Sequence, residues 1–230
     1  MAKANEIKYL TAIKTEKPRK KYCRFKKMGI RASHTAEVVL DDVRVPGHCL
    51  LGGKEKLDAK LARAREAGHS GEKQPAMSTF ETTRPSVGAQ ALGIARAAYE
   101  YALDYAKKRV QGGKPIVEQQ AVAMMLGTMA MKLDAARLQI WKAAWLADRK
   151  QPEARALGLL AKVNASETAF ECCRLAGEIL GGASIMHDHP VEKYLRDASS
   201  FLHSDGTNQV CLLRASQAIA NNAHGSVFGF

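Results

Sequence analysis

A carboxylate stands directly before a glycine and a threonine in the stretch DGTNQV, at residues 205–210. Such a carboxylate can remove a proton from a substrate as a general base, so Asp205 is a candidate catalytic residue. The same residue types also form ordinary helix N-caps, in which a side-chain oxygen accepts a backbone N–H of the first turn. This short stretch is compatible with both interpretations, and the cap is the simpler one.

Three other short patterns could also do chemistry. Arg109 precedes QGGKP and could bind an anion, although a cation at a helix C-terminus also compensates the helix dipole. Gly181 and Gly182 could let a ligand approach the backbone, although a helix C-cap is the simpler interpretation. The HDH stretch at 187–189 offers two imidazoles without a third ligand nearby, so we predict no metal site.

Helices must position these residues, because the chain after residue 76 is rich in alanine and repeats apolar residues at spacings of three and four. The breaks fall at QGGKP and at the Gly-Gly pair. Long helices are expected at about 76–110, 117–149, 153–180 and 206–221, with a shorter piece near Val191–Asp197. Long helices joined by short breaks predict an antiparallel four-helix bundle.

The start of the chain has a different composition. Residues 1–31 hold eleven Lys and Arg residues and supply much of the net charge of +12. Nucleic acid or an anionic membrane surface could attract such a segment, but no nucleic-acid-binding fold or amphipathic helix accompanies it. We interpret it as a solvated basic arm. AEVVLDDVRV, at 36–45, is rich in β-formers, and Lys54–Ala67 could form a short helix.

Further properties exclude whole classes of protein. No run of 18 apolar residues occurs, which excludes a membrane-spanning helix of ordinary length. The basic start lacks a long apolar segment, so no signal peptide is expected. The five cysteines are odd in number and form no CxxC pattern, which favours reduced, buried thiols in a cytoplasmic protein.

Six stretches, taken together and in order, resemble the acyl-CoA dehydrogenase family over about residues 25–220. They are KKMGIRASHTAEVVLDDVRVP (Lys26–Pro46), FETTRPSVGAQALGIARAAYEYALDYAKKR (Phe80–Arg109), QGGKPIVEQQAV (Gln111–Val122), EILGG (Glu178–Gly182), PVEKYLRDA (Pro190–Ala198) and DGTNQV (Asp205–Val210). The resemblance implies a mainly α fold, in which a short remnant of the family's middle β domain precedes its C-terminal four-helix domain. The implied segments are a basic, weakly ordered arm (1–24), the β remnant (25–52), a linker (53–75), the bundle (76–222) and a tail (223–230).

The resemblance also implies an oxidoreductase of fatty acid metabolism that oxidises an acyl-CoA thioester at its α and β carbons. Because an α proton of a thioester is a weak acid, such a site must hold a base and stabilise the developing enolate, while FAD accepts the hydride. The family's usual base position, immediately before Gly-Thr, holds Asp205 here. Some relatives place the base one residue before the arginine of the RP motif, where this chain has Thr83, which is no carboxylate.

The other roles carry over position by position. The positions that match FAD contacts are Arg109, Gln111, Gln119, Gln120, Gly181, Gly182, Thr207 and Gln209. Those that match substrate contacts are Glu81, Arg84 and Gly206. The family donates the first two FAD contacts across a dimer, so we expect a homodimer or homotetramer, or a hetero-oligomer with a complete homologue. An electron-accepting flavoprotein is a further possible partner.

Four departures from the family pattern keep two alternatives open. Aspartate is shorter than the usual glutamate by one C–C bond of about 1.5 Å, and relatives that oxidise nitroalkanes have aspartate there. Gly112 replaces a usual aromatic, and Glu178 places an anion near the expected FAD phosphates. The family's N-terminal helical domain and most of its β domain have no counterpart. The alternatives are a non-enzymatic truncated bundle that keeps the oligomerisation surface and a nitroalkane-oxidase-like flavoenzyme.

Overall fold

The computed structural model describes residues 39, 41–44, 46–49, 53–66 and 75–221, with the side chains of 60, 64, 75–79 and 81 excepted. The described residues before 67 and those from Pro75 onward belong to two separate compact units. In the first unit, the short helix η1 (Gly47–Cys49) precedes α1 (Lys54–Glu66). The predicted helix at Lys54–Ala67 is thus confirmed to within one residue.

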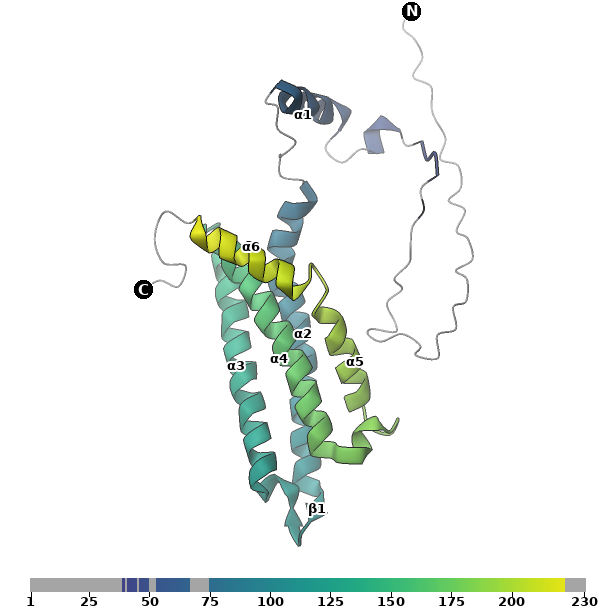
Figure 1. The fold of residues 1–230 in the computed structure, drawn as a ribbon, viewed down its shortest axis with the longest axis vertical. Coiled ribbons are helices and arrows are strands. Elements are labelled where there is room, and N and C mark those ends of the chain that lie inside the picture. The colour runs from purple at the N-terminus through teal and green to yellow at the C-terminus, as the bar shows by residue number, and fades with distance from the viewer. Residues whose placement is uncertain (1–38, 40, 45, 50–52, 67–74, 222–230) are drawn as a thin grey trace, which may run out of the picture. The chain divides into compact units, whose positions relative to one another are not determined.

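The second unit holds the remaining elements. In chain order they are α2 (Pro75–Lys108), β1 (Val110–Gln111), β2 (Lys114–Pro115), η2 (Ile116–Glu118), α3 (Gln120–Asp148), α4 (Ala154–Leu180), η3 (Gly181–Ile185), α5 (Val191–Phe201) and α6 (Asn208–Ala220). Helices α2, α3 and α4 lie side by side, α5 packs on α2 and α4, and α6 crosses the end of the bundle where α2 begins (Figure 1). The predicted mainly α bundle is therefore confirmed.

Small residues allow the central helices of this bundle to approach closely. Along α2, one face carries alanines at spacings of three and four residues, and all are fully buried: Ala91, Ala95, Ala98, Ala102 and Ala106. Because alanine has no rotamers to lose and little volume, its stripe lets α2 pack tightly on α4, the helix with which it makes its most extensive contact. The bundle therefore holds α2 firmly along most of its length.

A two-residue hairpin makes the break after α2. Strands β1 and β2 are antiparallel, with Val110 opposite Pro115 and Gln111 opposite Lys114. Gly112 (φ 62°) and Gly113 (φ 79°) form the turn, and a turn with two positive φ angles is the kind that glycine favours. Gly112, the departure from the family's aromatic, thus has a structural reason in this chain.

Some predictions about the first unit fall outside the described residues. The basic arm and most of the proposed β segment do so; residues 39 and 41–44, which are described, belong to no strand. The prediction that the cysteines are buried is wrong for Cys49, which lies exposed in η1, and right for Cys172, Cys173 and Cys211. None of the described helices is both long and apolar enough to cross a membrane.

Candidate functional site

The connection between α5 and α6 presents Asp205 to the first turns of α2. The Thr83 hydroxyl donates a 2.8 Å hydrogen bond to Oδ2 of Asp205, across 122 positions of sequence. The N-cap of α6 is Thr207, whose side chain accepts the backbone N–H of Val210 at 3.4 Å. The cap and the candidate base are therefore different residues, and the carboxylate of Asp205 is free to face α2.

The backbone of this connection is tightly turned. Asp205 has φ 54° and Gly206 has φ 102°, so two consecutive residues lie in the region that side chains other than hydrogen disfavour. A Cβ at Gly206 would stand 3.6 Å from the sulfur of Cys211, so the positive φ, more than the space, requires glycine there. Asp205 is left half-buried.

Lys162 supports this turn from inside the bundle, and sequence reasoning missed it. Its side chain is fully buried in α4. The ammonium donates to the carbonyl oxygen of Gly206 at 2.9 Å and to Oδ1 of Asn208 at 2.8 Å, with a longer contact of 3.5 Å to the carbonyl oxygen of Leu202. The available signal was a lone cation on a helix face whose other residues are apolar or small.

A buried network continues from the ammonium into α6. The Ser166 hydroxyl, one turn after Lys162, lies 2.9 Å from the backbone oxygen of Val163 and 3.1 Å from Oδ1 of Asn208, and it donates its single proton to one of them at a time. The Asn208 amide donates to Oε1 of Glu167 at 3.3 Å. Asn208 also lines a hollow of about 360 Å³, with Glu167, Phe170, Glu171, Leu202, His203 and Gln209 around it. Among the predicted FAD contacts, Gln209 therefore faces a cavity close to Asp205.

Burial lowers the pKa of Lys162, because removing an ammonium from water disfavours its charged form. Cys211, Asp205 and Glu167 oppose this shift, whereas Arg84 adds to it by like-charge repulsion. Arg84 is itself only 3% exposed, and its Nε has no hydrogen-bond partner among the described residues. Two buried cations thus lie close to the turn that carries Asp205.

The predicted contacts to the FAD phosphates gather at the opposite end of the bundle. Gln119 donates from Nε2 to the backbone oxygen of Gln111 at 3.2 Å, and the N–H of Ile116 donates to the backbone oxygen of Arg109 at 2.8 Å. These bonds fold the hairpin against the start of α3. The exposed side chain of Arg109 borders a hollow of about 370 Å³ with Tyr101, Asp104, Tyr105 and Lys108.

Gly181 and Gly182 lie near the same end, directly after α4. Gly181 ends the helix with φ 59°, and its N–H returns to the carbonyl oxygens of Glu178 and Gly177, so the predicted C-cap is present. The anion of Glu178 is paired with Arg174 one turn earlier on the same helix. This pairing reduces the repulsion that Glu178 would exert on a nearby phosphate.

The length of α2 separates the two groups of predicted residues. About 26 residues lie between Thr83 and Arg109, which at a rise of about 1.5 Å per residue amounts to about 39 Å. Figure 1 shows the beginning of α2 near α6 and its end at β1, with the end of α4 close to the latter. A flavin dinucleotide is much shorter than this span, so one bound molecule cannot contact both groups of a single chain.

Other predicted residues have mixed outcomes. The side chain of Glu81 lies outside the described residues, and Gln120 begins α3 with an exposed side chain. His189 contacts Tyr101, with 2.7 Å between Nδ1 and the phenol oxygen. Among the described residues, no three metal-ligating side chains come together.

The donors around the hairpin fit an anionic, phosphate-containing cofactor. A guanidinium with neighbouring amides offers charge and forked hydrogen bonds, which suit a diphosphate. Arg109, Gln111 and Gln120 all have exposed side chains, so their donor groups face outward. A cofactor bound there would gain from these groups without displacing the core.

Comparison with known proteins agrees with this geometry. The family profile described as "Acyl-CoA dehydrogenase, C-terminal domain" matches residues 74–220. The "Probable acyl-CoA dehydrogenase YngJ" of Bacillus subtilis is 41% identical over 186 residues, which cover 81% of this chain and 45% of that protein. The chain therefore spans about half the length of this curated relative.

Solved structures share the helical fold. Butyryl-CoA dehydrogenase from Megasphaera elsdenii is 37% identical, with a TM-score of 0.62 over 64% of this chain and 38% of its own. Nitroalkane oxidase in complex with spermine, a competitive inhibitor, is 28% identical, with a TM-score of 0.62 over 65% of this chain and 36% of its own. Both activities named in these structures correspond to alternatives raised by Asp205.

Proposed function

Because the chain belongs to the acyl-CoA dehydrogenase family through its C-terminal domain, we propose that it acts in the FAD-dependent α,β-dehydrogenation of an acyl-CoA thioester. The observation that carries this proposal is the orientation of Asp205. Its carboxylate is not used as the cap of α6 and faces α2 next to Thr83. Asp205 is the proposed base.

Each residue around Asp205 has a chemical task in this proposal. Asp205 accepts the α proton on a carboxylate oxygen, and the Thr83 hydroxyl fixes the plane of the carboxyl group through its 2.8 Å hydrogen bond. Lys162 supports the turn that carries this carboxylate through its hydrogen bond to the carbonyl oxygen of Gly206. The backbone of Gly206 and the side chains of Glu81 and Arg84 are the proposed substrate contacts.

FAD, when bound, would accept the hydride from the β carbon. Arg109 and Gln111 would bind its phosphates. Gln119 and Gln120, near the start of α3, would contact the flavin, and the turn at Gly181 and Gly182 would let the cofactor approach the backbone. Thr207 and Gln209 would contact the FAD that serves the same chain's Asp205. Since about 39 Å of α2 separates Thr83 from Arg109, we assign the phosphate contacts at each site to a second subunit.

A second subunit is also favoured by an apolar stripe on α3. Met124, Met131 and Leu138 recur every seven residues and are exposed by more than half, as are the two tryptophans that follow, Trp141 and Trp145. Monomeric proteins seldom expose so regular a row of apolar side chains to water, and such rows mark contact surfaces. The proposed partner is another copy of this chain or a complete homologue; an electron-accepting flavoprotein and a cytoplasmic location complete the proposal.

The decisive experiment asks whether FAD copurifies and whether an acyl-CoA bleaches it. We expect a yellow protein whose flavin absorbance falls on anaerobic addition of a short acyl-CoA, and bleaching at least about 100-fold slower in Asp205→Asn at unchanged FAD content. Asp134→Asn, an exposed carboxylate on α3, is the matched control. Rapid bleaching of Asp205→Asn would show that Asp205 is not the base.

Nitroalkane oxidation is the second candidate, favoured by the aspartate at the base position and by the similarity to nitroalkane oxidase. A nitroalkane should then bleach the flavin while acyl-CoAs do not. A purified protein that is colourless, and that retains no FAD once added FAD has been removed by gel filtration, would instead favour the third possibility, a helical bundle without catalytic activity.

A further inference from the structure

We propose that Lys162 is a positioning residue, which holds the Asp205 turn in the conformation that presents the carboxylate to α2. This inference rests on the proposed role of Asp205 as base. It concerns a residue that the family resemblance did not single out. Apart from the carbonyl oxygen of Gly206, which is also a proposed substrate contact, the hydrogen bonds of Lys162 go to Leu202 and Asn208, which have no proposed role in binding substrate or FAD.

The acceptors of the Lys162 ammonium lie on both sides of Asp205. Leu202 is the C-cap of α5, Gly206 follows Asp205 directly, and Asn208 opens α6. One ammonium thus links the end of one helix to the beginning of the next through contacts of 2.8–3.5 Å. A cross-link of this kind fixes the path of the chain between the two helices.

That path is one the chain would not keep without support. Asp205 has φ 54°, which is unusual for a residue with a Cβ, and Gly206 has φ 102°. The carbonyl of Gly206 points inward, where the only other donor to it among the described residues is the weak Sγ–H of Cys211 at 3.6 Å. Removing the ammonium leaves this part-buried oxygen with only the weak thiol donor, so the Gly206–Thr207 peptide would rotate toward water.

The carbonyl belongs to the Gly206–Thr207 peptide, whose rotation changes ψ of Gly206; the adjacent backbone of Asp205 would then shift and carry its carboxylate away from Thr83. The charges that face Lys162 come from several elements: Arg84 on α2, Glu167 on α4, Asp205 on the turn, and the Cys211 thiol on α6. Among the described residues, neither Glu167 nor Asp205 forms an ion pair with Lys162, whose hydrogen bonds all go to neutral oxygens of the connection. The hydrogen bonds of the ammonium therefore stabilise the turn between α5 and α6.

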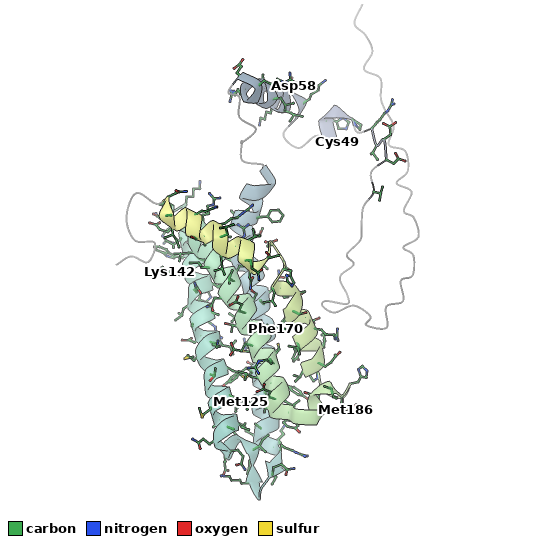
Figure 2. All side chains as sticks on the ribbon, viewed as in Figure 1. Cys49, Asp58, Met125, Lys142, Phe170 and Met186 are labelled. Atoms are coloured by element: carbon green, nitrogen blue, oxygen red, sulfur yellow. The ribbon has the colours of Figure 1, made fainter. Side chains whose placement is uncertain are left out.

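The first test measures the turn directly and needs no catalysis. Hydrogen–deuterium exchange is followed in the wild type, in Lys162→Met and in Lys142→Met. Methionine keeps an unbranched side chain of nearly the same length but has no hydrogen-bond donor, and Lys142 is an exposed lysine on α3 (Figure 2). We expect amides of 203–208 to exchange at least about tenfold faster in Lys162→Met, with α3 unchanged and no effect in the control. Unchanged exchange at 203–208 would overturn the proposal.

The second test separates positioning from general stabilisation. We expect Lys162→Met to slow flavin reduction by a saturating acyl-CoA by about 100-fold, with the substrate dissociation constant changed less than about threefold. The same substitution in the Asp205→Asn background should cause no further loss of rate. An equal loss in both backgrounds would mean that Lys162 acts only on stability and would overturn the proposal.

Two further variants keep the tests informative. Lys162→Gln retains an N–H donor group and replaces Lys162→Met if that protein does not fold. Its exchange rates and flavin-reduction rate should change in the same direction, by smaller factors. Lys162→Arg, which keeps the charge and the donors, should recover part of the rate. If the wild type shows no flavin reduction at all, the proposed function fails, while the exchange measurement still decides whether Lys162 supports the turn.

Discussion

The two ends of the bundle are built in different ways. At the α6 end, the turn of Asp205 is tied to α2 by Thr83 and to α4 by the buried Lys162. At the hairpin end, Arg109 and Gln111 point exposed side chains away from the core, held only through backbone bonds and Gln119. The first end holds the carboxylate of Asp205 by hydrogen bonds within one chain, whereas the second presents the exposed side chains of Arg109 and Gln111.

This difference indicates which parts of a catalytic site a chain can supply to itself. A base must be held to a fraction of an ångström, and that precision comes from buried hydrogen bonds within one fold. A phosphate contact tolerates more freedom, because charge acts over several ångströms. Exposed donors at the end of a long helix are therefore well suited to serve a neighbouring subunit.

The largest expected effect comes from mixing two inactive variants. Arg109→Ala and Asp205→Asn should each lose flavin reduction by at least about 100-fold at limiting FAD. If the two ends serve sites in different subunits of a symmetric dimer, co-expression of the variants should restore about a quarter of wild-type activity. Activity of the co-expressed mixture measures this, and purified, differently tagged mixed dimers, which hold one intact site of two, should reach about half of wild-type activity.

The matched control is a mixture of Arg109→Ala with the double variant that carries both changes. Such a mixture contains no intact site under any pairing, so it should stay inactive. Failure of the first mixture to recover any activity, with mixed dimers present, would mean that both ends belong to the same site.

A smaller effect is expected from Thr83→Val, which keeps the shape of the side chain and removes the donor to Asp205. A hydrogen bond to a charged group contributes about 1.5–3 kcal/mol, so the rate of flavin reduction should fall by about 10- to 100-fold. Thr128→Val is the control, because that hydroxyl bonds only the backbone oxygen of Met124 within α3. Equal rates in Thr83→Val and wild type would remove Thr83 from the site.

The smallest effect concerns the core between the ends. Burial raises the pKa of Cys172 to about 12 from 9.0, so above pH 9 the unfolded chain loses this proton before the folded chain does. The free energy of unfolding should therefore fall between pH 9 and 12, by at most about 1.4 kcal/mol per pH unit for this thiol. Urea denaturation at several pH values measures the slope.

Cys172→Ala should make this slope shallower, whereas Cys49→Ala should not, because Cys49 is exposed. Part of the slope should remain, since burial raises the pKa of the neighbouring Cys173 as well. An unchanged slope in Cys172→Ala would show that this thiol titrates alike in the folded and unfolded chain.

The sequence predicted the bundle because its information is local. Alanine-rich repeats and the glycine pairs placed the four long helices to within about three residues, with Gln111–Pro115 and Gly181-Gly182 as breaks. Helix periodicity depends on neighbours three and four positions apart, which a single sequence displays directly. The two-residue hairpin likewise follows from Gly112 and Gly113.

The site was less predictable because its contacts are long-range. In the family pattern, Thr83 is notable only because it is not a carboxylate. In the structure, its hydroxyl donates a hydrogen bond to the proposed base, 122 positions away in the sequence. Lys162 lies 44 positions from the carbonyl of Gly206 that it supports. Nor could the stretch DGTNQV show that Thr207, and not Asp205, caps the helix. Such pairings depend on how helices pack, which local patterns do not encode.

Helix α2 carries Thr83 near its beginning and ends one residue before Arg109, and fully buried alanines hold it against α4 along the way. A helix packed in this manner moves as a rigid body. In an oligomer in which the two ends of α2 serve different active sites, a tilt of α2 that opens one site would also move the FAD-binding residues of the other site. Turnover at the two neighbouring active sites would then be coupled through the movement of α2.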